Sequence, residues 1–263
     1  MNKYSLLPGL LLMASCAAVP ISGRRQLTFL PESQMVAMSM TEYDKFLSES
    51  KPVPASDQRT VMVKRVGQRI ASAVKQYFSQ KGQSKLLEGY DWEFNLVNEN
   101  TVNAWCMPGG KVVVYTGILP ITKDETGLAV VMGHEIAHAV ARHGNERMSQ
   151  GMLVQGAGMT LDVLTSQKPA LTRGIFLQSF GVGSQLGMLA YGRKHETEAD
   201  QLGLVFMAMA GYDPGAAPDF WKRMGALGGE KPPELLSTHP SNETRIKNIR
   251  SYLPEAQKYY KKR

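Results

Sequence analysis

The chain has 263 residues, of which 43% are hydrophobic and 20% are charged. This composition can supply a sizeable core, and it excludes a disordered chain, a collagen-like chain and a polytopic membrane protein. The formal net charge of +7 is a modest excess, typical of a solvated basic surface. No phosphate-binding loop or other nucleotide motif accompanies it, so we expect no nucleic-acid partner.

The N-terminus has the pattern of a targeting segment. Residues 1–15 hold one basic residue, Lys3, and an apolar run that is too short for a membrane span, which needs about 20 residues. The order Leu-Met-Ala-Ser-Cys ending at Cys16 resembles a bacterial lipobox. We therefore predict a lipoprotein signal peptide over 1–15 and a lipidated tether over 16–32, with an ordinary cleaved signal as the alternative. Ala17 lies where Asp would retain a lipoprotein in the inner membrane, which predicts a lipid anchor on the periplasmic face of the bacterial outer membrane.

The first half of the remaining chain mixes helix and strand signals. Apolar spacing predicts a helix over 32–50 and a second helix from an N-cap at Asp57 to about residue 81. Residues 92–97 alternate between apolar and polar side chains, as a half-buried strand does. Two short apolar runs then flank Pro108-Gly109-Gly110, which predicts a hairpin over 102–115.

From residue 123 onward the pattern is almost entirely helical, and no repeat or linker divides it. We expect a single α+β domain over residues 33–263, mostly helical, with a small sheet beside the central helix. The Gly-rich region 149–192 predicts a packed helical hairpin, with a mobile lid as the alternative. Cys106 is expected to be a small buried side chain.

The strongest motif is His134-Glu-Ile-Ala-His138, inside a predicted helix over 126–142. Positions i and i+4 share one helix face, so both imidazoles can reach a single Zn²⁺ at about 2.0–2.1 Å. Glu135 lies about 100° around the helix, where it can hold a water molecule beside the metal. Three ionisable groups in an otherwise apolar helix are costly unless they have a function.

A catalytic zinc needs a third protein ligand and one open position. No third histidine follows at the metzincin spacing, and His143 is placed about 180° around the same helix from His134. The acidic candidates lie between Glu196 and Asp200. These two share a helix face, whereas Glu198 points away from both.

Four blocks, in this order, resemble peptidase family M48, the gluzincins: residues 103–117, 134–143, 191–200 and 237–245. Among its members, the short periplasmic lipoproteins of the BepA and LoiP kind are most similar in layout, because neither membrane-spanning helices nor a C-terminal helical-repeat domain is expected. The resemblance implies a zincin-like metalloprotease domain with one Zn²⁺ per chain. It implies that His134, His138 and Glu196 are the metal ligands, and that Asp200 orients a ligating imidazole.

The resemblance also implies how peptide hydrolysis proceeds. Zinc polarises the scissile carbonyl, and Glu135 accepts a proton from the attacking water. His239 and Arg245 are the predicted catalytic helpers at the oxyanion, with Arg193 and Tyr191 as alternatives. For His239 three roles stay open: a gate on the fourth metal position, a donor to the oxyanion, or a packed loop residue.

The substrate is expected to be a protein or peptide chain that pairs with the strand beginning at Asn103, Ala104 and Trp105. The predicted function is a zinc endopeptidase that hydrolyses cell-envelope proteins in periplasmic quality control. The alternative is a periplasmic binding or assembly factor with a latent or structural zinc site.

Overall fold

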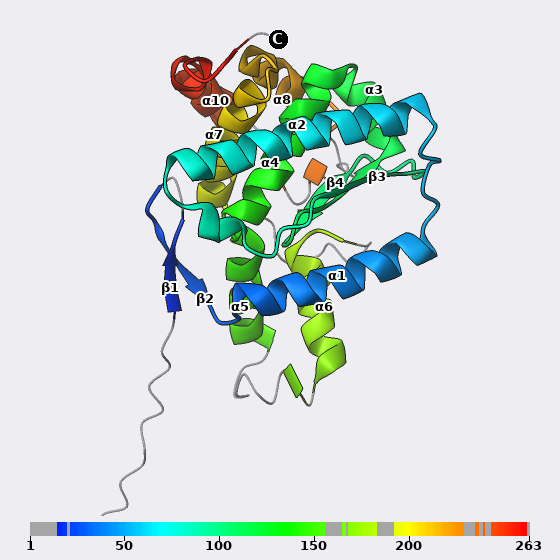
Figure 1. Cartoon of the computed structure of the whole chain (residues 1–263), viewed down its shortest axis with the longest axis vertical. Coiled ribbons are helices and arrows are strands. Elements are labelled where there is room, and N and C mark those ends of the chain that lie inside the picture. Colours follow the sequence, from blue (N-terminus) through cyan, green and yellow to red (C-terminus); the bar gives the residue numbers. More distant parts are fainter. Residues whose placement is uncertain are drawn as a thin grey trace, which may run out of the picture.

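A computed structural model describes residues 15–19, 22–155, 165–166, 168–182, 192–228, 235–236, 239 and 243–261. Helices dominate this part of the chain (Figure 1). The helices are α1 (Glu32–Glu49), α2 (Gln58–Gln80), α3 (Leu119–Thr122), α4 (Glu125–Val140), α5 (His143–Gln155), α6 (Pro169–Ser179), α7 (Arg193–Met209), α8 (Ala217–Gly225) and α10 (Glu243–Gln257). The strands are β1 (Ser15–Ala18), β2 (Arg25–Thr28), β3 (Glu93–Val97), β4 (Ala104–Met107) and β5 (Lys111–Tyr115). The predicted α+β class, mostly helical with a small sheet, is confirmed.

The central sheet has three strands in the order β3-β5-β4. Strand β5 runs parallel to β3 and antiparallel to β4, so β4 and β5 form the predicted hairpin. Gly109 and Gly110 both have φ of 83°, a left-handed conformation that glycine adopts without steric cost. A side chain at Gly110 would also meet the ring of Trp92 at 2.8 Å.

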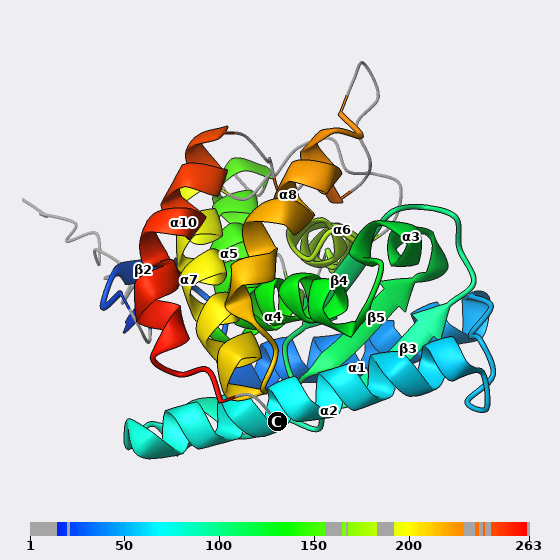
Figure 2. The same ribbon diagram turned by 90° about the horizontal axis from the view of Figure 1, so that it is seen from above.

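Helices cover both faces of this sheet (Figures 1 and 2). Successive side chains of a strand point to opposite faces, so Ala104 and Cys106 join the core that includes α2, α4 and α7. Trp105 and Met107 join a second core with side chains of α1, α5 and α6. All residues of β4 and β5 are buried, which accounts for the nearly continuous apolar runs in the sequence.

Helices α4 and α7 cross at two glycines. A Cβ added at Gly203 would lie 2.9 Å from the backbone nitrogen of His134, and one added at Gly133 would lie 3.0 Å from the Gly203 carbonyl oxygen. Only glycine at both positions permits this distance. The crossing therefore places the helix that carries the HExxH motif directly against the helix that carries Glu196.

Helix α4 ends two residues earlier than its sequence pattern predicts. It begins at an N-cap, Asp124, whose side chain accepts a hydrogen bond from the Gly127 nitrogen at 2.9 Å. It ends at Val140, and Arg142 has φ of 61°. The chain turns at this left-handed residue before α5 starts at His143, so His143 does not continue the face on which one long helix would place it.

The segment predicted as a tether is structured where it is described. Strand β1 pairs antiparallel with β2, and Cys16 lies opposite Leu27 in that register. The predicted signal peptide lies almost wholly outside the described residues, as does the Cys16 side chain, so cleavage and acylation stay predictions.

Helices α5 and α6 are joined by hydrogen bonds from Arg147 to the Ser179 and Gln178 carbonyls.

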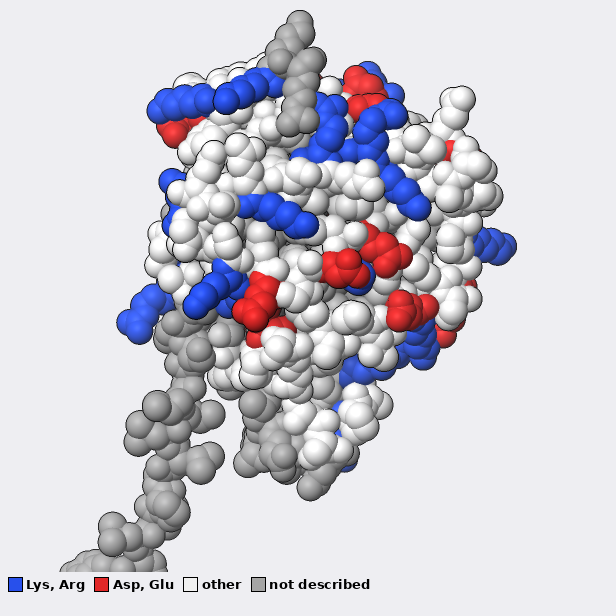
Figure 3. All heavy atoms as spheres, viewed as in Figure 1, with Lys and Arg blue, Asp and Glu red and all other residues white. Residues whose placement is uncertain are grey.

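Within the described ranges, no helix is both long enough and apolar enough to cross a membrane. On the face shown in Figure 3, Lys and Arg side chains are distributed over several elements, with acidic side chains between them. This distribution agrees with the solvated basic surface expected from the net charge of +7.

Candidate metal centre

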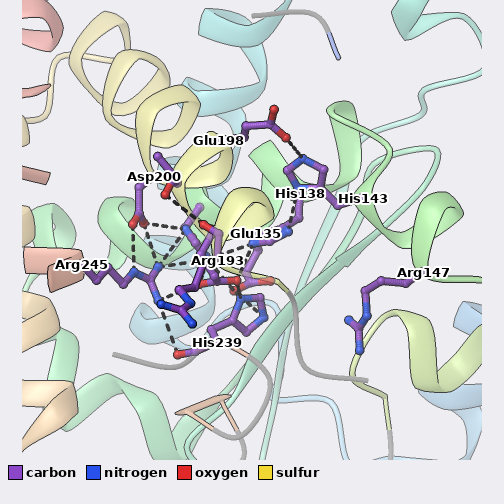
Figure 4. A network of polar contacts seen from close by, with 12 residues as sticks. Glu135, His138, His143, Arg147, Arg193, Glu198, Asp200, His239 and Arg245 are labelled. Atoms are coloured by element: carbon purple, nitrogen blue, oxygen red, sulfur yellow. Dashed lines mark hydrogen bonds and ion pairs between the residues drawn. The ribbon is translucent and has the colours of Figure 1, made fainter. Parts of the chain in front are cut away.

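Four buried side chains from three parts of the chain converge on one point (Figure 4). His134 and His138 come from α4, Glu196 from the first turn of α7, and His239 from a residue preceding α10. One ligand atom from each lies within 4.8 Å of the other three. The Nε2 atoms of His134 and His138 are 3.1 Å apart. The Glu196 carboxylate is 3.5 Å from the first and 3.3 Å from the second.

These distances fit a tetrahedral metal ion. Four ligands at about 2.0–2.1 Å from a zinc ion are about 3.3 Å from one another. His239 completes the group, because its Nδ1 is 3.1 Å from the Nε2 of His134 and 2.9 Å from a Glu196 oxygen. Two imidazole nitrogens and a carboxylate are a common donor set for zinc. The chemistry and the spacing of the group both suit such an ion.

The charges around the ligands also favour a cation. Burial alone would raise the pKa of Glu196. The charges of Arg245 and the neighbouring histidines outweigh burial and hold this pKa well below its usual range. Burial lowers the pKa of His138 well below its usual value, so this imidazole is neutral and keeps a lone pair for a metal. Burial also opposes a charge on His134, but Glu196 and Asp200 outweigh it and raise its pKa to about 9. A metal ion therefore competes with a proton for His134.

Asp200 and Arg245 lie behind His134. An Asp200 oxygen is 3.0 Å from His134 Nδ1, which assigns the proton to Nδ1 and leaves Nε2 as the ligand atom. Arg245 donates to both Asp200 oxygens, at 2.8 and 2.7 Å, and pairs with Glu196 at 2.7 Å. Its guanidinium also lies 3.5 Å from the ring centroid of Trp221. Through these contacts Arg245 positions the carboxylates of Asp200 and Glu196. The role of Arg245 at the oxyanion, predicted from the sequence, stays a prediction.

Glu135 lies beside the group of four candidate ligands and is not a member of it. Its Oε1 is 3.7 Å from His239 Nε2, and among the described residues it has no hydrogen-bond partner. Burial raises the pKa of this carboxyl group. A buried carboxylate with an unused oxygen near a metal centre can accept a proton and give it up again, as a general base and acid must.

Behind His138 the structure shows a contact that the sequence pattern does not predict. His143 Nδ1 is 3.0 Å from His138 Nδ1, and His143 Nε2 is 3.1 Å from a Glu198 oxygen (Figure 4). Glu198 does point away from the metal group, but it reaches His138 through His143. The predicted position of His143, about 180° around from His134, assumed that the helix of the motif continues through residue 143. The turn at Arg142 removes that assumption.

The predicted substrate residues have different surroundings. The side chain of Asn103 is buried, and its Nδ2 has no hydrogen-bond partner within the described ranges. Its Oδ1 accepts a hydrogen bond from the Ala104 nitrogen at 2.9 Å. The Trp105 ring instead packs edge-on against Tyr43 and Phe46 in the second core and is buried. Of the alternative helpers, Tyr191 lies outside the described residues.

Comparisons with known proteins agree with this geometry. The profile of Peptidase family M48 matches residues 58–253. The mitochondrial metalloendopeptidase OMA1 of Schizosaccharomyces pombe is 38% identical over 247 residues, which cover 91% of this chain and 67% of that protein. Human metalloendopeptidase OMA1, mitochondrial, is 32% identical over 91% of this chain, which spans about half (46%) of its length. The Escherichia coli β-barrel assembly-enhancing protease is 30% identical over 61% of this chain and 34% of its own length.

These relatives overturn the predicted location at the bacterial outer membrane. The proteins that align over about nine tenths of the chain, from yeasts to human, are named as mitochondrial. The bacterial relative from Escherichia coli aligns over 61%. The incorrect location rested on five residues ending at Cys16 and on Ala17. So short a pattern carries little specificity, because small and apolar residues are common in every class of targeting segment.

Proposed function

Because the chain belongs to Peptidase family M48 and is a metalloendopeptidase, we propose that it is a zinc enzyme that cleaves misfolded or misassembled proteins. The observation that carries the proposal is the convergence of His134, His138 and Glu196 with Glu135 beside them. The Escherichia coli relative is named for enhancing β-barrel assembly, which supports a substrate class of misassembled proteins.

In this proposal His134, His138 and Glu196 hold the zinc, with one ion per chain. When bound, zinc lowers the pKa of a water molecule and stabilises the developing oxyanion. Glu135 accepts the proton of the attacking water and passes it to the leaving amine. Its burial suits the second step, since a carboxyl group with a raised pKa is a better proton donor near neutral pH.

The substrate is proposed to bind as an extended strand along β4. Strand β4 lies at the end of the order β3-β5-β4, and the Tyr115 nitrogen donates to the Asn103 carbonyl. Backbone groups alternate along an antiparallel strand, so those of Ala104 face away from β5. The Ala104 carbonyl oxygen can accept a hydrogen bond from a peptide, whereas its N–H already donates to Asn103 Oδ1. The Asn103 amide can donate to the same peptide. Trp105 is not part of this proposal, because its ring lies in the core and its backbone faces β5.

The decisive experiment replaces Glu135 by Gln. Removing a general base typically costs 10²–10⁴-fold in rate, so we expect cleavage of denatured casein to fall by about that factor while zinc content stays near one per chain. Glu49→Gln is the matched control, because Glu49 is an exposed residue of α1 that pairs with Lys45 at 3.8 Å and is no member of the metal group. Wild-type cleavage by the Glu135→Gln protein would contradict the proposal. A wild-type protein that binds denatured protein without cleaving it would support the binding-factor alternative.

For His239 we propose the role of a gate on the fourth metal position. Its Nδ1 is as close to the ligand atoms of His134 and Glu196 as these are to each other, so it competes with water for that position. Replacing His239 by Ala should then raise peptidase activity. A donor to the oxyanion would give the opposite sign, a loss of activity. Activity within twofold of wild type, with normal zinc content, would leave only a packing role.

A further inference from the structure

Arg24 lies between two buried carboxylates far from it in sequence. Its NH1 and NH2 donate to the two Glu146 oxygens at 2.9 and 2.7 Å. Its Nε and NH2 donate to the Glu198 oxygens at 3.1–3.2 Å. The Arg24 side chain is 22% exposed, and the two carboxylates are 9% and 8% exposed. Bidentate pairs of this kind fix the planes of both partners.

Each of these carboxylates holds a histidine. Glu198 contacts His143 Nε2 at 3.1 Å, and Glu146 contacts His195 Nε2 at 2.9 Å. The two imidazoles stack, with ring centroids 4.7 Å apart and an interplanar angle of 29°. Arg24 therefore fixes this pair of rings from both sides, through one carboxylate on α5 and one on α7.

Of the two rings, that of His143 contacts the metal centre. His143 Nδ1 is 3.0 Å from His138 Nδ1, and the Nε2 of His138 faces the other ligands. The contacts assign one consistent set of protons. His143 donates from Nε2 to Glu198 and accepts at Nδ1 from the Nδ1–H of His138, which leaves the lone pair of His138 Nε2 for the metal.

We propose that Arg24 is a positioning residue of the metal centre: it fixes Glu198, which orients His143, which in turn sets the tautomer and ring angle of His138. This inference rests on the proposed zinc site, and it gives the segment before α1 a part in the chemistry. Ser22 of the same segment also donates to Glu198. Two residues of this segment, Ser22 and Arg24, thus bond to the same carboxylate, which ties the segment to the metal centre.

A merely structural latch would have a different signature. If Arg24 only held the N-terminal segment in place, its loss would lower the melting temperature of the protein without changing how tightly the folded protein binds zinc. If it acts through Glu198 and His143, its loss changes zinc affinity and the ligand field. Arg25 provides a matched control, because it is the neighbouring arginine of the same segment and is exposed.

The test measures zinc affinity of the full chain by competition with a chromophoric chelator. Losing a partner behind a metal ligand typically costs 10–100-fold in metal affinity, so we expect a loss of about 10-fold or more for Arg24→Ala and less than twofold for Arg25→Ala. The visible spectrum of the Co²⁺-loaded protein should change in the first variant only. Should Arg24→Ala fail to fold, Arg24→Gln, which keeps most of the side-chain length, is judged by the same thresholds.

A double-mutant cycle then tests the route. In a Glu198→Gln background, Arg24→Ala should change zinc affinity by less than twofold, because the route is already broken. An equal loss in both backgrounds, or wild-type affinity in Arg24→Ala, would overturn the inference. A wild-type chain that binds no zinc would overturn the proposed function as well, so the two failures are distinguishable.

Discussion

The crossing of α4 and α7 gives the sharpest test of how packing sets the metal centre. A methyl group added by Gly203→Ala would lie 2.9 Å from the His134 nitrogen and 3.0 Å from the Gly133 carbonyl carbon. Ordinary contacts of this kind begin at 3.4 Å. Both clashing groups are helix backbone and cannot rotate away, so the two helices must separate by about 0.5 Å.

This separation has two consequences of different size. Overpacking typically lowers the free energy of unfolding by about 1–3 kcal/mol. The better helix propensity of alanine offsets up to about 1 kcal/mol of this loss. We therefore expect a net loss of about 1–2 kcal/mol, or roughly 2–8 °C in melting temperature for a chain of this size. The metal centre is less tolerant, because ligand distances must hold within about 0.2 Å and the proposed ligands His134 and Glu196 lie on the two separated helices. Zinc affinity should fall by about 10-fold or more.

The assay combines thermal unfolding of chelator-treated protein with zinc competition, and Gly174→Ala is the control. Gly174 lies inside α6, and an added Cβ there would meet nothing within 4 Å. This substitution should stabilise the protein by up to about 1 kcal/mol and leave zinc affinity unchanged. A Gly203→Ala protein with wild-type stability and zinc affinity within twofold would refute the reasoning that the crossing distance positions the ligands.

Three further predictions concern charge and capping. Burial opposes the ionisation of Glu146, but hydrogen bonds from His195 and Arg24 outweigh it and lower its pKa from 4.5 to about 2. The stabilising contribution of the Glu146 carboxylate is therefore present above pH 4.5 and is lost as the pH falls toward 2. The urea midpoints of chelator-treated wild type and Glu146→Gln should therefore converge from pH 6 to pH 3, and a constant gap would contradict the assignment. Glu196→Gln should lose zinc by competition assay while keeping its circular dichroism spectrum, and retained zinc would exclude it as a ligand. Asp124→Ala should destabilise the protein by about 1 kcal/mol in urea, because α4 loses its N-cap, and an unchanged midpoint would show that the cap contributes nothing.

The parts of the centre that depend on regular spacing could be predicted from the sequence. His134 and His138 share a helix face by the helical repeat alone, and Glu196 and Asp200 do so four residues apart. In the structure His134, His138 and Glu196 belong to the buried group that could hold a metal ion, and an Asp200 oxygen lies 3.0 Å from His134 Nδ1. The hairpin before them was equally visible, since Gly109 and Gly110 permit a left-handed turn.

The parts that depend on breaks in regular structure could not be predicted. His143 contacts His138 because Arg142 takes a left-handed conformation, and an arginine is not a residue that predicts such a turn. The role of Arg24 depends on partners that are 122 and 174 residues away, which no local pattern encodes. Trp105 was placed on the substrate edge by strand position alone. The side-chain alternation of β4 instead puts its ring in the second core.

The two imidazoles of α4 that we propose as zinc ligands are supported in a similar way from segments far apart in the sequence. Behind His134, Asp200 is held by Arg245 of the C-terminal helix α10. Behind His138, the carboxylate of Glu198 acts through His143 and is held by an arginine of the N-terminal segment. In both cases an arginine fixes a carboxylate. Asp200 accepts the proton of His134 Nδ1 directly, whereas Glu198 orients His143, which accepts the proton of His138 Nδ1. Neither end of the chain is therefore peripheral to the centre: local unfolding of α10 or of the N-terminal segment would release the orientation of one imidazole, even while the helix that carries the motif stays folded.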